Sequence, residues 1–417
     1  MTWLRLALAN LSLSPLTSAV NVVLMALGTG SIVLLLLAGS QFSETMSRDA
    51  RSIDLVLGPK GSPVQLVLSA VYHADLPPGN IQLSDAQRWA DDPRIETAVP
   101  VSLGDSHRGF RIVGTTQAYA SLYGAELASG RFWQETMEAV VGAAAAHADG
   151  LEIGSSFAGA HGLQEGSLNH ESHPYRVVGI LEPTGTVIDR LILTSLSSVW
   201  AVHGEENAHE NPHQEPEVDN HSDPHEHDAH SHEDAEDLEI TAMLLTYRSP
   251  IAALSLPREI NAGGSLQAAA PAMEIARILG LVGIGLDGLT AFAWVLILTA
   301  AMSVFAALYG SLRSRRNDLA ILRCLGATRW ELLVALLLEG LLLSTAGVAL
   351  GFVLGHGAAE LLGTWLGNSR GIELTGLTWI AAESRLIFGL LSVGAVAAAI
   401  PAVQAYRTDV ARTLAEG

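Results

Sequence analysis

Charged residues are scarce in this sequence. They make up 16% of its 417 residues, whereas about a quarter is usual for a soluble domain. Cysteine is scarcer still, and the single Cys324 excludes an internal disulfide and a cysteine-rich metal site. Hydrophobic residues account for 49% of the chain. This composition indicates a protein with membrane-spanning segments.

Basic residues are few as well. The chain has 23 lysines and arginines against 43 acidic residues, which gives a formal net charge of −20. The imbalance is local, because residues 203–237 contain 13 acidic residues and no basic one. Nucleic-acid binding needs basic patches, which a chain with this balance and 6% aromatic residues does not offer. We therefore expect no nucleic-acid partner.

Catalytic motifs are also missing. The sequence has no G-x-x-x-x-G-K-[ST] phosphate-binding loop and no spacing that suggests a Ser–His–Asp triad. We expect that the chain is not an enzyme and holds no tightly bound cofactor, so that ATP would act only through a partner subunit. Isolated histidines such as His73, His107 and His147 are expected to be ordinary polar positions.

Long uncharged runs occur near the N-terminus and in the last third of the chain. A helix crosses the bilayer core with about 20 apolar residues. A cleaved signal peptide is the alternative for the first run, because Arg5 precedes it, but residues 6–43 are all uncharged and exceed the roughly 30 residues of a signal. We predict an anchor, preceded over residues 1–15 by an amphipathic helix that lies on membrane lipids. The predicted spans are 16–40, 271–312 (which includes a stalk), 332–363 and 385–406.

The short loop 313–331 between the second and third spans is basic. Short basic loops stay in the cytoplasm. With the tail 407–417 on the same side, we expect both termini in the cytoplasm. Residues 41–270 and the loop 364–384 should then lie on the outer side of the membrane. The arginines of the basic loop are Arg313, Arg315, Arg316, Arg323 and Arg329.

Residues 41–270 have the mixed pattern of a folded domain. Apolar and polar residues alternate in several short runs, and helix-like segments lie between them. The run "SIDLVLGPKGSPVQLVLS" (52–69) alternates apolar and polar residues around a Gly-Pro turn, which predicts a strand followed by a turn. The expected fold class is a multi-pass α-helical membrane protein with four spans arranged 1+3 and a large α+β extracytoplasmic domain inserted between the first and second.

Two stretches resemble a known family. "LRCLGATRWELL" (322–333), followed by "LLLEG" and "GVALGFVLG", is similar to the core of FtsX-type permeases. "ASGRFWQETMEAVVGAAAAHADGLEIGSSF" (128–157) and "YRVVGILEPTGTVIDRLILTSLSSVW" (175–200) resemble the periplasmic core domain of MacB. The chain is thus similar to MacB/FtsX-like permeases of type VII ABC transporters, the mechanotransmission superfamily. The resemblance implies a place in the bacterial inner membrane, with residues 41–270 and the loop 364–384 in the periplasm.

The resemblance implies partners and a coupling site. Such permeases form dimers, with themselves or with a paralogue, and bind a separate cytoplasmic ABC ATPase. A periplasmic adaptor or a metal-binding lipoprotein is a further expected partner. The alternative for the basic loop is that its arginines only set the topology. The resemblance also implies that residues 313–331 contain a cytoplasmic coupling helix. The coupling residues that it implies are Arg316, Asp318, Leu322, Arg323, Gly326, Ala327 and Arg329.

Glu339 is an acidic residue inside the third predicted span. A carboxylate in a span suggests a functional site. The alternative is a residue that packs between helices or lies near the membrane surface, since Glu339 is about two turns from the cytoplasmic end.

Residues 203–237 hold eight of the fifteen histidines, interleaved with acidic residues. The segment has no apolar period and is predicted to be disordered. Histidine-rich tracts are typical of metal binding, and we predict exchangeable Zn²⁺ binding there. A solubilising insertion and a pH sensor are the alternatives. The predicted ligands are His203, His209, His213, His221, His225, His227, His230 and His232.

The expected function is a permease subunit that turns ATP hydrolysis by its partner into work in the periplasm, linked to zinc or another divalent metal. A lipoprotein-release or efflux permease without a metal role is one alternative. A regulator of cell-wall hydrolases that transports nothing is the other.

Overall fold

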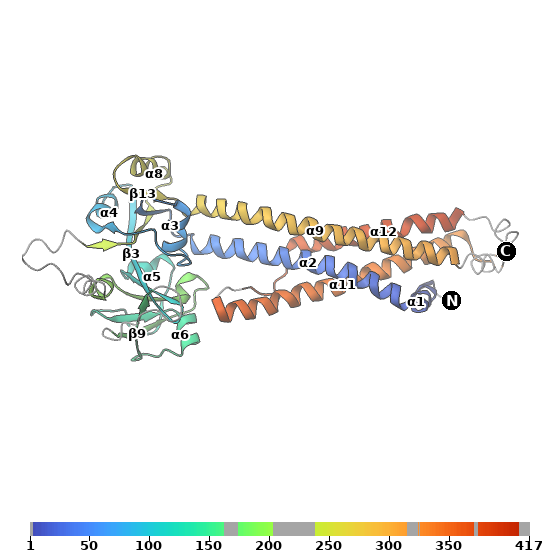
Figure 1. Cartoon of the computed structure of the whole chain (residues 1–417), viewed down its shortest axis with the longest axis horizontal. Helices are drawn as coiled ribbons and strands as arrows, with labels where there is room; N and C mark the ends of the chain where they lie inside the picture. The colour runs from blue at the N-terminus through green and yellow to red at the C-terminus, as the bar shows by residue number, and fades with distance from the viewer. Residues whose placement is uncertain are drawn as a thin grey trace, which may run out of the picture. The chain divides into compact units, whose positions relative to one another are not determined.

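A computed structural model describes residues 3–161, 174–202, 238–314, 324, 326–370 and 374–407. It divides into two compact units. One comprises residues 1–43 and 281–417, and the other comprises residues 44–280. The first unit is helical and the second is an α/β unit (Figure 1).

Four long helices make up most of the helical unit. They are long and apolar enough to cross a membrane, over Pro15–Asp49, Pro271–Arg313, Arg329–Trp365 and Ala381–Gln404. Their runs without charged residues explain this, because a helix satisfies its own backbone hydrogen bonds in lipid. The helices of this unit are α1 (Trp3–Leu13), α2 (Pro15–Asp49), α9 (Pro271–Ser314), α11 (Arg329–Arg370) and α12 (Ala381–Arg407).

Small residues bring these helices close together. Gly347, Gly351 and Gly355 form a row with i, i+4 spacing on α11, and α2 packs against it. A Cβ added to Gly351 would lie 2.5 Å from the Cβ of Thr29. Such small-residue rows let transmembrane helices approach each other closely. The α2–α11 contact therefore depends on glycine.

A second close contact joins α11 to α12. A Cβ on Gly340 would lie 2.3 Å from the Cβ of Ala398, and one on Gly394 would lie 2.0 Å from Oγ of Ser344. The rings of Trp330, at the start of α11, and Tyr406, at the end of α12, have centroids 5.8 Å apart. The two helices therefore run antiparallel, and the last described turn of α12 lies beside the first turn of α11.

The α/β unit is built on a mixed sheet with the strand order β13-β1-β12-β3-β4-β10-β6-β9-β5, to which β7 and β8 add through β9 and β3. Most neighbouring strands are antiparallel, but β10–β4 and β6–β9 are parallel. A second, two-stranded sheet pairs β11 with β2. The strands are β1 (Leu55–Pro59), β2 (Ile81–Gln82), β3 (Ile95–His107), β4 (Phe110–Thr115), β5 (Leu127–Gly130), β6 (Glu138–Val141), β7 (Ser156–Phe157), β8 (Ala160–His161), β9 (Tyr175–Leu181), β10 (Leu191–Ser195), β11 (Glu239–Ile240), β12 (Ala242–Tyr247) and β13 (Leu266–Ala269).

Both faces of the sheet are buried. In β10, Leu191 and Leu193 belong to one hydrophobic cluster, and Ile192 belongs to another. Successive side chains of a strand point to opposite faces, so an unbroken apolar run fills both cores. The short helices of this unit are α3 (Pro63–Ala70), α4 (Leu83–Ala90), α5 (Ala118–Leu122), α6 (Ala143–Asp149), the 3₁₀ turn η1 (Val187–Arg190) and α8 (Ala252–Ala262), and residues 196–202 are also helical.

Residues 52–69 contain the predicted strand and turn, and a helix follows the turn. β1 ends at Pro59, and Pro63–Ala70 is the helix α3. Ser62 caps this helix, because its Oγ accepts a hydrogen bond from the N–H of Gln65 at 3.3 Å, and Pro63 occupies the first helical turn. Ser followed by Pro is a helix start signal, and it outweighs the alternating pattern.

Candidate functional site

The turn that leads into α11 contains the described part of the predicted coupling site. Gly326 has φ +104, a conformation that strains any residue with a Cβ, and a Cβ there would meet nothing within 4 Å. Gly326 and Arg329 are exposed and Ala327 is half-buried. Backbone geometry, and not crowding, is therefore what requires glycine at position 326.

A reciprocal pair of hydrogen bonds fixes the start of α11. The N–H of Thr328 donates to Oε2 of Glu331 at 2.6 Å, and the N–H of Glu331 donates to Oγ1 of Thr328 at 3.3 Å. This is a capping box, and the sequence signal for it is "TRWE" (328–331). The resemblance to the permease family includes this stretch, but the cap itself was not predicted. The cap sets the direction in which the turn leaves the helix.

The other predicted coupling residues, Arg316, Asp318, Leu322 and Arg323, lie outside the described residues, so their placement is a prediction. Cys324 is exposed. The structure thus places Gly326 and Ala327 in the turn and Arg329 at the first residue of α11, with Gly326 and Arg329 open to solvent.

Glu339 is 4% exposed. It lies one residue before Gly340, where α11 and α12 touch. Other polar groups are buried in the same unit, including Asn21 at 1% and Thr29 at 0% exposure. Burial among helices agrees with a packing role and with a functional role, so the two interpretations of Glu339 stay open.

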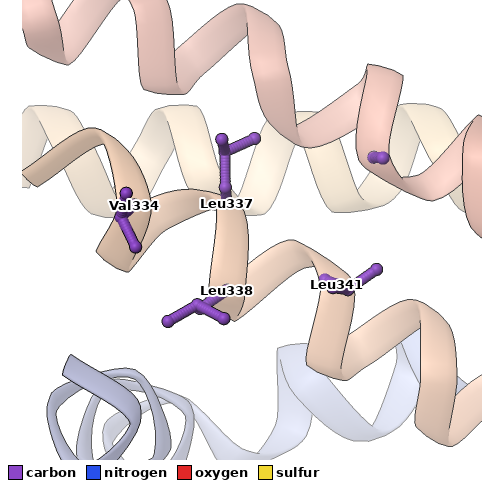
Figure 2. Close-up of a pocket in the computed structure, with 5 residues that line it drawn as sticks. Val334, Leu337, Leu338 and Leu341 are labelled. Carbon is purple, nitrogen blue, oxygen red and sulfur yellow. The ribbon is translucent and has the colours of Figure 1, made fainter. Parts of the chain in front are cut away.

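A shallow hollow lies on α11 beside α12, with a volume of about 240 Å³ (Figure 2). Figure 2 shows Val334, Leu337, Leu338 and Leu341 along one stretch of α11, and Ala395 of α12 completes the lining. All five side chains are apolar. Such a surface offers no acid, base or nucleophile and suits contact with lipid or with another helix.

The α/β unit contains a buried histidine. His73 is 6% exposed, and its Nε2 lies 2.8 Å from the hydroxyl oxygen of Tyr119. Burial, with the nearby charge of Arg111, lowers the pKa of His73 to about 3. The ring is therefore neutral at ordinary pH and acts as a structural hydrogen-bonding group.

An acidic group in the same unit is held as the anion. Glu138 accepts hydrogen bonds from both terminal nitrogens of Arg131, at 2.7 and 2.5 Å, and from the N–H groups of Gln134 and Glu135. The bonds from Arg131 are the main reason that the pKa of Glu138 falls to about 2. This network fastens the loop between β5 and β6 to the sheet.

His107 also has a structural role, because both of its ring nitrogens form hydrogen bonds. Its Nε2 lies 2.8 Å from Oδ2 of Asp149, and its Nδ1 lies 2.8 Å from the carbonyl oxygen of Ala158. Arg108 donates to the second carboxylate oxygen of Asp149 at 2.6 Å. These bonds join the β3–β4 hairpin to α6. His147 is exposed on the same helix.

Among the described residues, no three His, Cys, Asp or Glu side chains are placed to hold a metal ion. All eight predicted zinc ligands, from His203 to His232, lie outside the described residues. The zinc hypothesis therefore stays a prediction from the sequence.

Comparisons with known proteins assign both units. Residues 18–218 match the family model of the MacB-like periplasmic core domain, and residues 290–410 match that of the FtsX-like permease C-terminal region. None of the curated proteins searched matches the chain.

Two solved structures are similar to part of the chain. The periplasmic region of MacB from Actinobacillus actinomycetemcomitans is 13% identical, with a TM-score of 0.33, over 56% of this chain and 97% of that one. The extracellular domain of the noncanonic ABC-type transporter YknZ from Gram-positive bacteria is 11% identical, with a TM-score of 0.31, over 51% and 98%.

The expected fold class is confirmed. Four helices that can span a membrane are present in the 1+3 arrangement, and the periplasmic core domain lies between the first and the second. The two family matches lie in the order that this architecture requires, and the chain belongs to the MacB/FtsX-like permeases.

Proposed function

We propose that this chain is the permease subunit of an ABC transporter in the bacterial inner membrane, with both termini in the cytoplasm. A separate cytoplasmic ATPase would bind it and drive movement of the periplasmic domain. The length of α2 and α9 is the observation that carries this proposal. They have 35 and 44 residues, so at about 1.5 Å per residue they extend well beyond a bilayer core of about 30 Å.

A continuous helix is a stiff element that passes on a displacement from one end to the other. Both α2 and α9 contribute residues to both compact units. A tilt or rotation of either helix in the membrane is thus a means of moving the α/β unit without any passage for cargo between the helices.

The coupling site would be the basic loop that ends in the turn at Gly326. Its exposed Arg329 supplies a charge to a soluble partner, and the capping box at Thr328 and Glu331 keeps the turn rigid. The test is Gly326→Ala, which strains the backbone at φ +104, matched with Gly357→Ala, where a Cβ also meets nothing and φ is ordinary.

ATPase stimulation is measured in membranes that contain both subunits. We expect Gly326→Ala to lower it several-fold with normal insertion, and Gly357→Ala to leave it unchanged. Charge reversal at Arg323 should act in the same way as Gly326→Ala. Full stimulation in both of these coupling-loop variants would contradict the coupling role.

A dimer would form through α9. One face of this helix exposes large apolar side chains, including Ile284 (71%), Phe292 (62%) and Met302 (63%). On the same face, Gly285 and Gly288 have open space where a Cβ would be. Exposed glycines allow a second helix to come close. Disulfide formation between two copies carrying Gly288→Cys and Cys324→Ser would support this interface, and its absence would favour another one.

Zinc handling is the proposed purpose of the system, and the composition of residues 203–237 supports it. Eight histidines among 13 acidic residues provide many alternative sets of three or four ligands, which suits exchangeable binding. A periplasmic adaptor or metal-binding lipoprotein would be the partner that exchanges metal or cargo with this segment.

Zinc titration of the full chain and of a variant without residues 203–237 tests this. We expect binding in the micromolar range or tighter, loss of most of it on deletion, and weakening below about pH 6 because the ligands must lose protons. An unchanged titration would leave lipoprotein release, efflux or regulation of cell-wall hydrolases as the function of the permease.

A further inference from the structure

Residues 374–383 fasten three helices of the helical unit, α2, α11 and α12, to one another. Gln41 of α2 forms a closed pair of hydrogen bonds with the backbone of Thr375: its Nε2 donates to the carbonyl oxygen at 2.7 Å, and its Oε1 accepts from the N–H at 2.9 Å. A single side chain of α2 thus holds a loop more than three hundred positions later in the chain. We call the residues joined here, Gln41, His356, Glu360, Thr375, Gly376 and Glu383, the outer clasp.

Helix α11 holds the other side of the same loop. Glu360 accepts from Oγ1 of Thr375 at 3.0 Å and from the N–H of Gly376 at 2.8 Å. The Nδ1 of His356 lies 2.6 Å from the carbonyl oxygen of Gly376. The fit is tight, because a Cβ on Gly376 would lie 2.0 Å from the carbonyl oxygen of His356.

The hydrogen bond from His356 to Gly376 defines which ring nitrogen of His356 carries the proton. A carbonyl oxygen only accepts, so Nδ1 must carry a proton toward Gly376. The neutral ring then has a bare lone pair on Nε2. This atom faces Oε1 of Glu383 at 3.5 Å, and neither atom has a hydrogen-bond partner among the described residues. Two acceptors therefore face each other, and one proton between them is missing.

Glu383 is enclosed and His356 is within reach of solvent. Glu383 is 0% exposed, and the side chain of His356 is 22% exposed. The second oxygen of Glu383, Oε2, accepts from the N–H of Ile380, so the carboxylate is fixed in place. A buried acceptor without a donor is costly, and a proton that enters past His356 removes this cost.

The clasp lies about one membrane thickness from the turn at the other end of α11. From Trp330 to His356 the helix rises about 39 Å, close to the roughly 40–45 Å of a bilayer with its headgroups. Trp379 stacks over His356 with ring centroids 6.0 Å apart and is 58% exposed, as expected of an aromatic residue at a membrane surface. Protons in the adjoining water can thus reach the site.

Other groups around His356 do not supply this proton. α2 presents the neutral Gln41, and the loop presents Thr375, Gly376 and Trp379. On α11 itself the titratable neighbour is Glu360, which is occupied as an acceptor by two donors. On α12, Arg385 is exposed and lies two positions after Glu383, which places it on a different side of the helix.

We propose that the His356–Glu383 pair is a proton-binding site, and that uptake of one proton between Nε2 of His356 and Oε1 of Glu383 tightens the outer clasp. Acid would then hold α2 more firmly to α11 and α12. The inference concerns a contact within the helical unit and stands whether or not the proposed cargo and ATPase coupling are right.

Hydrogen exchange of the full chain in lipid nanodiscs tests the site, with rates corrected for the intrinsic effect of pH. We expect the amides of Thr375 and Gly376 to exchange about tenfold more slowly at pH 5.5 than at pH 8, the effect of one added hydrogen bond to a charged group. Glu383→Gln supplies a permanent donor to Nε2 and should give slow exchange at both pH values. Glu360→Gln keeps an acceptor and should retain the pH dependence.

Equal exchange at the two pH values in the wild type, or a wild-type pH dependence in Glu383→Gln, would overturn the proposal. Faster exchange in acid would also overturn it, because that sign belongs to protonation of Glu360. Exchange of the β6 and β9 amides shows whether each variant is folded. If Glu383→Gln is not folded, His356→Gln decides, since it should abolish the pH dependence.

Discussion

The helical unit and the α/β unit are held together in different ways. In the helical unit, glycine and alanine bring backbones into contact, as at Gly351 and Thr29. In the α/β unit, large side chains such as Leu191 and Ile192 fill both faces of a sheet. The hydrophobic effect drives the packing of the α/β unit. Helices in lipid gain little from burying apolar surface, so their association depends on a close fit.

Buried polar groups do not divide the two units in the same way. Glu138 of the α/β unit has four hydrogen bonds. In the helical unit, both amide atoms of Asn21 and the hydroxyl of Thr29 are buried without a hydrogen-bond partner among the described residues. Both units thus combine well-bonded polar groups with buried ones that lack a partner. The α/β unit also contains Tyr175 and Tyr247, whose hydroxyl oxygens are buried without a partner among the described residues, and the helical unit contains the outer clasp.

The largest loss of stability is expected from a substitution in the glycine row of α11. Gly351→Val would place side-chain atoms within 2.5 Å of Thr29 and 2.8 Å of the carbonyl oxygen of Ala26. We expect it to cost about 3 kcal/mol or more, at the upper end for overpacking, and to reduce folded protein in membranes sharply. Gly357→Val is the matched control, because a Cβ there meets nothing within 4 Å. Similar yields of the two variants would contradict the account of α2–α11 packing.

A smaller effect is expected from the ion pair of the α/β unit. Glu138→Gln removes the charge that Arg131 binds, and should destabilise this unit by about 1.5–3 kcal/mol, measured by hydrogen exchange of β6 and β9 in the full chain. Because folding lowers the pKa of Glu138 to about 2, its contribution is complete above about pH 4.5 and is lost as the pH falls toward 2. As the pH falls through that range, the α/β unit of Glu138→Gln should therefore lose less stability than that of the wild type. An identical acid profile would show that the pair contributes nothing.

The last expected effect is confined to acidic pH and concerns His73. Its pKa is lowered to about 3 in the folded chain, so protons bind the unfolded chain more readily below about pH 6.5. Stability should be complete above that pH and fall by up to about 1.4 kcal/mol per pH unit toward pH 3. His73→Asn tolerates φ +53 and should flatten the slope between pH 6.5 and 5, where few carboxyl groups titrate. An unchanged slope would assign the pH dependence to other groups.

The sequence predicts the helical unit well, because long uncharged runs have few structural alternatives. It also predicts the α+β character of residues 41–270 from short alternating runs. The helix that follows the turn in 52–69 was not predicted, because the alternating pattern there conflicts with the Ser62–Pro63 helix start, which is the stronger signal. The capping box could have been predicted from the sequence, since Thr328 and Glu331 lie three residues apart in one turn.

The outer clasp was beyond sequence reasoning. Gln41 and Thr375 are separated by 334 positions, and neither residue has a chemistry that marks it as special. His356 and Glu383 lie on different helices, and only the antiparallel packing of α11 and α12 brings them together. The coupling loop before Gly326 and the histidine-rich segment are still known from sequence alone.

In the proposed mechanism, ATP hydrolysis by the partner subunit moves the α/β unit through the continuous helices α2 and α9. Spin labels at Ser121→Cys, an exposed position, in a Cys324→Ser background measure the distance between two copies of this unit in the assembled transporter. The account predicts that the distance distribution differs between the ATP-bound and nucleotide-free states, and that Gly326→Ala reduces the difference. An unchanged distribution in a complex that hydrolyses ATP would contradict it.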